Sequence, residues 1–292
     1  MGRIEEALAK IQARRTAKAE PALQRADLVV PPAAVSAAPF EPVSHFYGGK
    51  FLHVNIEQLR PLGLLATETE ERKVSEQYRR AKRPLIKNAS PTLVPRMHRG
   101  NLLLVTSALP GEGKTFTCLN LCFSLAREQD WSVVLVDGDC NKPHLSRLFG
   151  AENEPGLMDL LRDSKKDFDS VVMPTDVPNF SLVPAGKRHA DSVELLASNT
   201  MDALCNEISG ADPKRMIVFD SSPLLLTSEA PALATQMSQV VLVVQANQTP
   251  QRAVVAALGR LDPAKAISLL LNQVSEGSND GEYGGQYYGY GD

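Results

Sequence analysis

Residues 102–115 read LLLVTSALPGEGKT, and this stretch decides the fold of the chain. An apolar run of strand length leads directly into a glycine-rich loop, and an apolar-periodic helix begins after the loop. A Walker A phosphate-binding loop needs this context, because glycines let the backbone wrap a phosphate and a helix N-terminus favours negative charge. The loop departs from the strict pattern only at Ala108, where the pattern has glycine.

Two side chains at the start of that helix carry the chemistry that the loop predicts. Lys114 would place a positive charge beside the β- and γ-phosphates, and the Thr115 hydroxyl would bind Mg²⁺. The sequence therefore predicts a site for ATP and Mg²⁺. The residues of the loop and of the first helical turn that we expect to contact the nucleotide are Gly111, Glu112, Gly113, Lys114, Thr115 and Phe116.

The alternation of strand and helix continues to about residue 274. The strands are uniform apolar runs, as is typical of strands buried on both faces of a parallel sheet. Repeated strand–helix units predict a doubly wound α/β domain with a mostly parallel sheet. The expected strands are 102–106, 133–136, 181–183, 216–219, 240–244 and 267–271, and the expected helices include 115–128, 192–208 and 250–261.

Three aspartates stand at the ends of two of these strands. Asp137 and Asp139 close one apolar run, and Asp220 closes another, as a Walker B aspartate does. Because residues i and i+2 of a strand point the same way, we expect Asp137 and Asp139 to face the phosphates together at the carboxyl edge of the sheet. The expected catalytic residues are Lys114, Asp137, Asp139 and Asp220, and the expected metal ligands are Thr115 and the three aspartates.

These residues are sufficient for phosphoryl transfer, because charge on the γ-phosphoryl group can be neutralised and one aspartate can orient or deprotonate the attacking hydroxyl. They do not decide what attacks. Water would make the protein an ATPase, and a protein hydroxyl would make it a kinase.

The C-terminal tail favours the kinase. After Ser275 the chain has no aliphatic residue and many glycines, so we expect a disordered segment over 276–292. Four of the six tyrosines of the chain lie there, and a long tether could deliver their phenols to an active site, including that of a neighbouring subunit. A tail that only associates weakly is the alternative interpretation. The expected phosphate acceptors are Tyr283, Tyr287, Tyr288 and Tyr290.

Composition divides the rest of the chain. We expect a basic amphipathic helix over 1–19, an Ala/Pro-rich linker over 20–54, a charged helical segment over 55–100 and the P-loop domain over 101–275. The first helix would dock on a partner or on an anionic membrane surface, or contact nothing.

Charge and composition exclude several classes of protein. A net charge of −3 argues against nucleic acid as a partner, and no apolar stretch approaches the length of a membrane span. The four cysteines form no CxxC pair, and the N-terminus has no apolar signal-peptide core. We therefore expect a cytoplasmic protein.

The sequence resembles the bacterial tyrosine kinases of capsule and exopolysaccharide export, called BY-kinases. Within that family it is most similar to the autokinases encoded in exosortase (XrtA, PEP-CTERM) exopolysaccharide loci. The resemblance covers most of the chain. It is carried by MGRIEEAL, SEQYRRAKRPL, TSALPGEGKTFT, VLVDGDCNKP, VPAGKRHADSVELLAS, IVFDSSPLLLTSEA and the tyrosine tail.

The resemblance implies an ATP-dependent autokinase that phosphorylates its own tail and regulates exopolysaccharide synthesis or export. It implies that Lys114 and Thr115 bind ATP and Mg²⁺, and that Asn272 lies near the adenine. The second motif of the family often reads DxDxR, but Asn141 stands at the arginine position here, and Lys142 follows it as a substitute charge.

The resemblance also implies partners. Relatives without membrane spans are usually activated by a membrane-embedded chain-length determinant protein, so we expect recruitment to the inner face of the cell membrane. Many relatives form rings in which each tail enters the next active site. The helix motif ExxRxxR at that subunit contact reads Glu76, Arg79 and Lys82 here, so the third position departs from the family.

Two alternatives share the predicted fold. An ATPase switch of the MinD/ParA type has the same P-loop architecture, but such proteins carry a lysine five positions before the Walker lysine, where this chain has Leu109. They also have no reason to end in a tyrosine cluster. A non-catalytic module that senses ATP is the third reading, and Asn141 is its only support.

Overall fold

The computed structural model describes residues 48–92, 94–163 and 165–274. The expected N-terminal helix over 1–19, most of the 20–54 linker and the tyrosine tail lie outside the described residues. Within the described part, none of the helices combines the length and the apolar character that crossing a membrane requires.

A seven-stranded sheet in the order β3-β4-β2-β5-β1-β6-β7 forms the middle of the described domain. Neighbouring strands are parallel, except that β3 runs antiparallel to β4. The sheet confirms the predicted doubly wound α/β fold. The strands are β1 (Leu102–Ser107), β2 (Ser132–Asp137), β3 (Met173–Pro174), β4 (Phe180–Val183), β5 (Arg215–Asp220), β6 (Gln239–Gln245) and β7 (Ala266–Asn272).

Alternate residues of each central strand face two separate apolar layers. In β1, Leu102 and Leu104 belong to one cluster of buried side chains, whereas Leu103 and Val105 belong to the other. All four are completely buried. Burial on both faces is the reason that these strands read as uniform apolar runs in the sequence.

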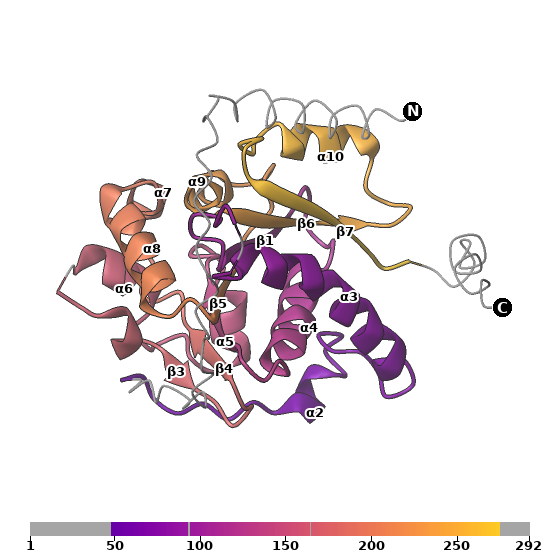
Figure 1. The fold of residues 1–292 in the computed structure, drawn as a ribbon, viewed down its shortest axis with the longest axis horizontal. Helices are drawn as coiled ribbons and strands as arrows, with labels where there is room; N and C mark the ends of the chain where they lie inside the picture. Colours follow the sequence, from indigo (N-terminus) through magenta and orange to yellow (C-terminus); the bar gives the residue numbers. More distant parts are fainter. Residues whose placement is uncertain (1–47, 93, 164, 275–292) are drawn as a thin grey trace, which may run out of the picture.

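Helices cover both faces of the sheet (Figure 1). On one face, α3 (Glu71–Ala89) packs along α4 (Lys114–Ala126), and the short α2 (Ile56–Leu59) and α5 (His144–Leu148) complete the layer. The other face carries five of the described helices. A 3-10 turn, η1 (Phe168–Ser170), precedes β3. Those five are α6 (Leu157–Arg162), α7 (Ser192–Leu196), α8 (Asn199–Ala211), α9 (Glu229–Gln236) and α10 (Gln251–Leu258).

Two local expectations differ from the structure. The single helix expected over 192–208 is divided into α7 and α8, because Ser198 leaves the helical conformation and its side chain caps α8 by accepting a hydrogen bond from the Met201 N–H at 3.2 Å. The sequence also did not predict β3, which has only two residues and pairs at the edge of the sheet.

The last residues of the expected linker belong to the domain. Leu52 forms an isolated parallel bridge with Thr175, and the Val54 N–H donates to the Asp176 carboxylate at 2.9 Å. Both Leu52 and Val54 are buried. This corrects the linker boundary at residue 54, since backbone pairing and apolar burial already hold the chain in this segment.

The charged segment expected over 55–100 packs directly on the P-loop domain. Tyr78 and Leu85 of α3 are 6% and 2% exposed, and they share one apolar cluster with Leu119 and Leu125 of α4. Most of the polar residues of α3 therefore cover its outer side, and Lys82 is the buried exception.

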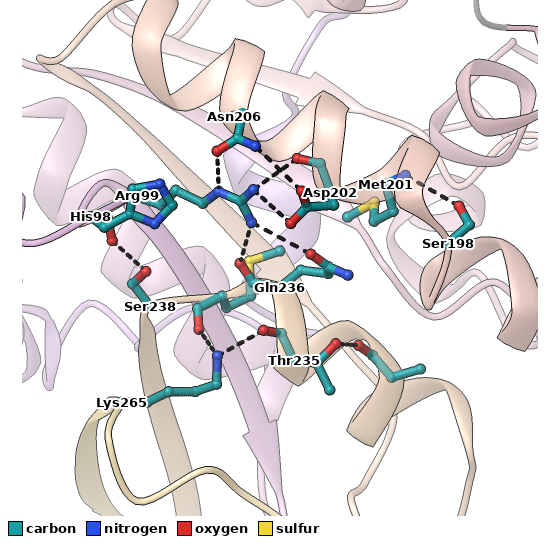
Figure 2. A network of polar contacts seen from close by, with 12 residues as sticks. His98, Arg99, Ser198, Met201, Asp202, Asn206, Thr235, Gln236, Ser238 and Lys265 are labelled. Carbon is teal, nitrogen blue, oxygen red and sulfur yellow. Dashed lines mark hydrogen bonds and ion pairs between the residues drawn. The ribbon is translucent and has the colours of Figure 1, made fainter. Parts of the chain in front are cut away.

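A polar network closes the amino edge of the sheet (Figure 2). The guanidinium of Arg99, just before β1, donates to the Asp202 carboxylate at 2.8 Å, to Asn206 at 2.9 Å and to the Gln236 carbonyl at 3.5 Å. Lys265, just before β7, donates to backbone carbonyls at the end of α9. This network lies at the edge opposite the carboxyl ends of the parallel strands, where ligands bind in such folds.

Candidate active site

The glycine-rich loop connects β1 to α4 and uses glycines in the left-handed region. Gly111 has φ 83°, and Gly113, the N-cap of α4, has φ 86°. Side chains strongly disfavour this conformation, so the sequence needs glycine at both positions to bring the chain round into the helix. Lys114 and Thr115 then form the first turn of α4.

Thr115 joins this loop to the end of β5. Its hydroxyl donates to Asp220 Oδ2 at 2.9 Å. Asp220 is 5% exposed, and its other oxygen, Oδ1, is buried without a hydrogen-bond partner among the described residues. Burial raises the pKa of Asp220 from 3.8 to about 7; the negative charge of Asp137 adds to the rise, and Lys114 opposes it.

Asp137 lies beside Asp220, because β2 and β5 are neighbours and these two residues are paired in register. Ser146, in α5, donates both its backbone N–H (2.8 Å) and its hydroxyl (2.7 Å) to Asp137 Oδ2. The same hydroxyl accepts the Ala185 N–H at 3.0 Å. Burial raises the pKa of Asp137 to about 6, although the Ser146 hydrogen bonds oppose the rise.

Asp139 differs from its expected placement. β2 ends at Asp137, so the two aspartates do not stand on one strand. The Asp139 N–H instead turns back to Asp137 Oδ1 at 3.3 Å, and Asp139 Oδ1 accepts the Lys142 N–H at 3.0 Å. Burial raises the pKa of Asp139, and the charge of Glu229 adds to the rise. The two carboxylates are close because of a turn and not because of strand geometry.

Asn141, which stands where the family often has arginine, contacts the start of α9. Its side-chain amide donates to the carboxylate of Glu229, the first residue of α9. The loops after β2 and β5 are therefore joined at this point. Lys142, the neighbouring cation, is exposed, and its backbone N–H supports Asp139.

The donor set fits a magnesium ion. The buried, unpartnered Asp220 Oδ1 and the adjacent Thr115 hydroxyl are hard oxygen donors of the kind that Mg²⁺ prefers. The described residues contain no group of three or more His, Cys, Asp or Glu side chains that could hold a metal ion together. The three aspartates thus do not form a closed cage, in keeping with an ion that takes its other ligands from phosphates and water.

Asn272, at the end of β7, lies against the phosphate-binding loop. Its side-chain amide donates to the Glu112 carbonyl at 3.0 Å, and a Cβ atom on Gly113 would lie 2.0 Å from Asn272 Nδ2. Gly113 is therefore needed for close approach as well as for its φ. An adenine contact by Asn272 stays a prediction.

Two expected site residues point instead into the contact between α3 and α4. The partly buried ring of Phe116 packs against Tyr78, with 6.4 Å between ring centroids, and its contact with a nucleotide stays a prediction. Lys82 has a 6% exposed side chain whose ammonium group lies 2.8 Å from Glu128 and donates to the Ser124 carbonyl. This burial corrects the expectation that Lys82 makes a subunit contact.

The other two residues of that motif remain on the outer side of α3. Glu76 and Arg79 are 45% and 57% exposed and pair with each other at 2.7 Å. They are accessible to a neighbouring subunit, and their role stays a prediction. The four acceptor tyrosines lie outside the described residues.

Sequence reasoning did not single out three residues of the site, namely Ser146, Glu229 and Thr249. Thr249 donates its hydroxyl to the Glu112 carboxylate. The partners of Glu229 and Thr249 are 88 and 137 positions away in the chain. Glu229 falls within the segment IVFDSSPLLLTSEA, but no motif assigned a role to any of the three. Only the fold brings them to the loop.

Comparisons with known proteins agree with this geometry. The CobQ/CobB/MinD/ParA nucleotide binding domain family matches residues 103–282. The tyrosine-protein kinase YwqD of Bacillus subtilis is 32% identical over 190 residues, which are 64% of this chain and 77% of YwqD. The tyrosine-protein kinase ptk of Acinetobacter johnsonii is 27% identical over 182 residues, and there the match spans 62% of this chain but only 24% of ptk.

Solved structures give the same result. The kinase domain of VpsO is 27% identical with a TM-score of 0.57, over 72% of this chain and all of that one. The kinase domain of the Escherichia coli tyrosine kinase ETK, at 24% identity and a TM-score of 0.60 over 75% of this chain and 80% of that one, shares the fold. The chain therefore belongs to the CobQ/CobB/MinD/ParA family of nucleotide-binding domains and, within it, to the bacterial tyrosine-protein kinases.

Proposed function

We propose that this protein is a tyrosine autokinase that transfers the γ-phosphoryl group of ATP to the tyrosines of its own C-terminal tail. The observation that carries the proposal is the 2.9 Å hydrogen bond from Thr115 to Asp220. It places the Walker A helix, the buried Asp220 and its neighbour Asp137 at one point of the carboxyl edge.

Each group has a role in the transfer. The loop and Lys114 bind the phosphates, and Thr115 and Asp220 would hold Mg²⁺, which when bound neutralises charge on the phosphate oxygens. The phenolic oxygen of a tail tyrosine forms a bond to the γ-phosphorus, while the bond to the β–γ bridging oxygen breaks and ADP leaves with the electron pair. The phenolic proton passes to an aspartate.

Asp139 is the aspartate that an incoming phenol reaches most readily. Asp137 and Asp220 are 1% and 5% exposed, whereas Asp139 is only partly buried. Its elevated pKa makes it a stronger base than an exposed aspartate. Asp137, with one oxygen saturated by Ser146, is better suited to orienting its neighbours.

The tail is long enough to work in trans. It leaves the described chain at Val274, and an extended chain of nine to sixteen residues spans roughly 30–55 Å to the acceptor tyrosines. We propose a homo-oligomer in which the tail of one subunit enters the site of the next, with Glu76 and Arg79 at the contact.

The resemblance extends the proposal to the cell. The kinase would be recruited from the cytoplasm to the inner face of the membrane by a membrane-embedded polysaccharide chain-length determinant protein, and would regulate exopolysaccharide synthesis or export. Loss of membrane recruitment on deleting residues 1–19 would support a docking role for that segment, and unchanged recruitment would refute it.

The decisive experiment is incubation of the purified full chain with Mg·ATP, followed by phosphopeptide mass spectrometry. We expect phosphate on Tyr283, Tyr287, Tyr288 or Tyr290, lowered at least about a hundredfold by Lys114→Met. Lys166→Met, at an exposed lysine away from the carboxyl edge, is the matched control. Steady ADP release without phosphotyrosine would refute the kinase and favour the MinD/ParA-like ATPase.

A mixing experiment tests transfer between subunits. The Lys114→Met chain, which keeps its tail, is the acceptor, and a chain with all four tail tyrosines changed to Phe is the donor. Phosphate on the acceptor tail supports transfer in trans. A wild-type chain that phosphorylates itself while the mixture stays unmodified would refute it.

A further inference from the structure

The carboxylate of Glu112 is buried, although it belongs to the loop that binds anionic phosphates. Glu112 is 1% exposed. Its Oε2 accepts the backbone N–H of Leu109 at 2.5 Å, within the same loop, and its Oε1 accepts the hydroxyl of Thr249. Each oxygen thus accepts a hydrogen bond from the protein, and the side chain is almost completely closed off from solvent.

Thr249 is itself fixed where it stands. It lies in the connection between β6 and α10, and its hydroxyl oxygen accepts the Gln245 N–H at 3.2 Å. The Thr249 N–H returns to the Gln245 carbonyl at 3.1 Å. The hydroxyl therefore uses one lone pair and its proton in two separate bonds, and it connects the end of β6 to the phosphate-binding loop.

A buried carboxylate in a phosphate-binding loop has two energetic costs. Burial removes its hydration, and its negative charge opposes the phosphates that the loop is expected to bind. The two hydrogen bonds offset the first cost but not the second. A buried carboxylate that accepts one hydrogen bond from the backbone of its own loop and another from the Thr249 side chain is best explained by the shape that it gives the loop.

We propose that Glu112 and Thr249 form a buried latch that holds the phosphate-binding loop in the conformation that receives the nucleotide. Both are positioning residues, because their side chains act on the loop and not on the ligand. The proposal rests on the proposed function only in taking a nucleoside phosphate as the ligand of the loop.

The test removes the hydroxyl and keeps the volume. Thr249→Val leaves Glu112 Oε1 and the Gln245 N–H without partners, and we expect ADP affinity of the full chain, measured by titration calorimetry with Mg²⁺, to fall about tenfold. Thr249→Ser keeps the hydroxyl and should stay within about twofold of wild type. In kinase assays the Val variant should raise KM for ATP in parallel and change kcat less than KM.

A matched control separates positioning from general loss of stability. Thr175, in the turn between β3 and β4, also has a hydroxyl that both donates and accepts: it donates to the Phe180 carbonyl at 2.7 Å and accepts the Val177 N–H at 3.1 Å. Thr175→Val should lower thermal stability without changing ADP affinity.

Equal ADP affinity of the Thr249→Val and Thr175→Val chains would overturn the latch. Equal weakening by Thr249→Ser and Thr249→Val would also overturn it, because the hydroxyl would then be irrelevant. A wild-type chain that binds ADP but forms no phosphotyrosine would refute the proposed function and leave the latch standing. A wild-type chain that does not bind ADP would overturn both.

Discussion

Replacing Asp220 by Asn should make the nucleotide-free protein more stable while abolishing catalysis. Asp220 is almost completely buried, its Oδ1 has no hydrogen-bond partner among the described residues, and Asp137 adds a second negative charge beside it. Asn keeps the shape and can still accept the Thr115 hydroxyl, but it carries no charge. The variant therefore avoids the free-energy cost of burying a negative charge, a cost that exists only in the folded state.

The size of the effect follows from the pKa of Asp220. Burial raises that pKa from 3.8 to about 7. Each pH unit between the unfolded and folded values is worth about 1.4 kcal/mol, so the ionised side chain lowers the free energy of unfolding by up to about 4 kcal/mol. The penalty is absent below the unfolded value, grows as the pH rises between the two values and is complete above the folded value. The advantage of Asn should therefore widen by about 2–3 kcal/mol between pH 5 and pH 8.

Urea unfolding at both pH values, with EDTA present, measures the difference directly. At pH 8 the midpoint of thermal unfolding should rise by about 5–15 °C. Mg·ADP should stabilise the wild type and stabilise the Asn variant much less, because the variant has lost a ligand oxygen. Asp167→Asn, at an exposed aspartate, is the control. An Asn variant that is no more stable than the wild type at pH 8, or a gain independent of pH, would refute the reasoning.

Substitutions at four further positions test other parts of the structure. Arg99→Ala should cost about 2–3 kcal/mol of unfolding free energy without changing KM for ATP, since its network (Figure 2) lies at the opposite edge from the site. Arg99→Gly should cost about 1 kcal/mol less, because the residue has φ 51°, and equal losses in chemical denaturation would contradict this backbone argument. Leu85→Ala should cost about 2–5 kcal/mol in the same assay, because Leu85 is 2% exposed in the layer that holds α3 on α4, and a loss below 1 kcal/mol would mean that α3 packs loosely. Lys82→Met should leave the oligomeric state unchanged in light scattering, because the ammonium group is turned inward to Glu128, and a shift in mass would reinstate Lys82 as a subunit contact. Ser146→Ala removes a hydrogen bond to the Asp137 carboxylate, so it should raise the pKa of Asp137 above about 6 and move the acid limb of the pH profile of kcat/KM to higher pH. An unmoved acid limb would show that ionisation of Asp137 does not limit the rate.

Local sequence was enough for the parts that depend on neighbouring residues. The run of residues 102–115 contains strand, loop and helix together, and the glycines at 111 and 113 adopt the positive φ that the loop pattern requires. Strands buried on both faces appear as continuous apolar runs, so the order of strands and helices could be predicted directly from the sequence.

Short or interrupted elements were not predicted correctly, because weak local signals decide them. The two residues of β3 carry no periodicity, and a single serine cap divides α7 from α8. The boundary of the domain at residues 48–54 depends on pairing with Thr175 and Asp176, which are more than a hundred positions away.

The sequence by itself determined the fold class, the family and the chemistry of the phosphate-binding loop, because these reside in contiguous motifs. The tertiary structure alone decided which groups surround that loop. The pairing of β2 with β5 brings Asp137 and Asp220 into register. The fold also brings the Ser146 hydroxyl to Asp137 and the Thr249 hydroxyl to Glu112. It also turned Lys82 inward, because the face of a helix that becomes buried depends on the surface against which it packs.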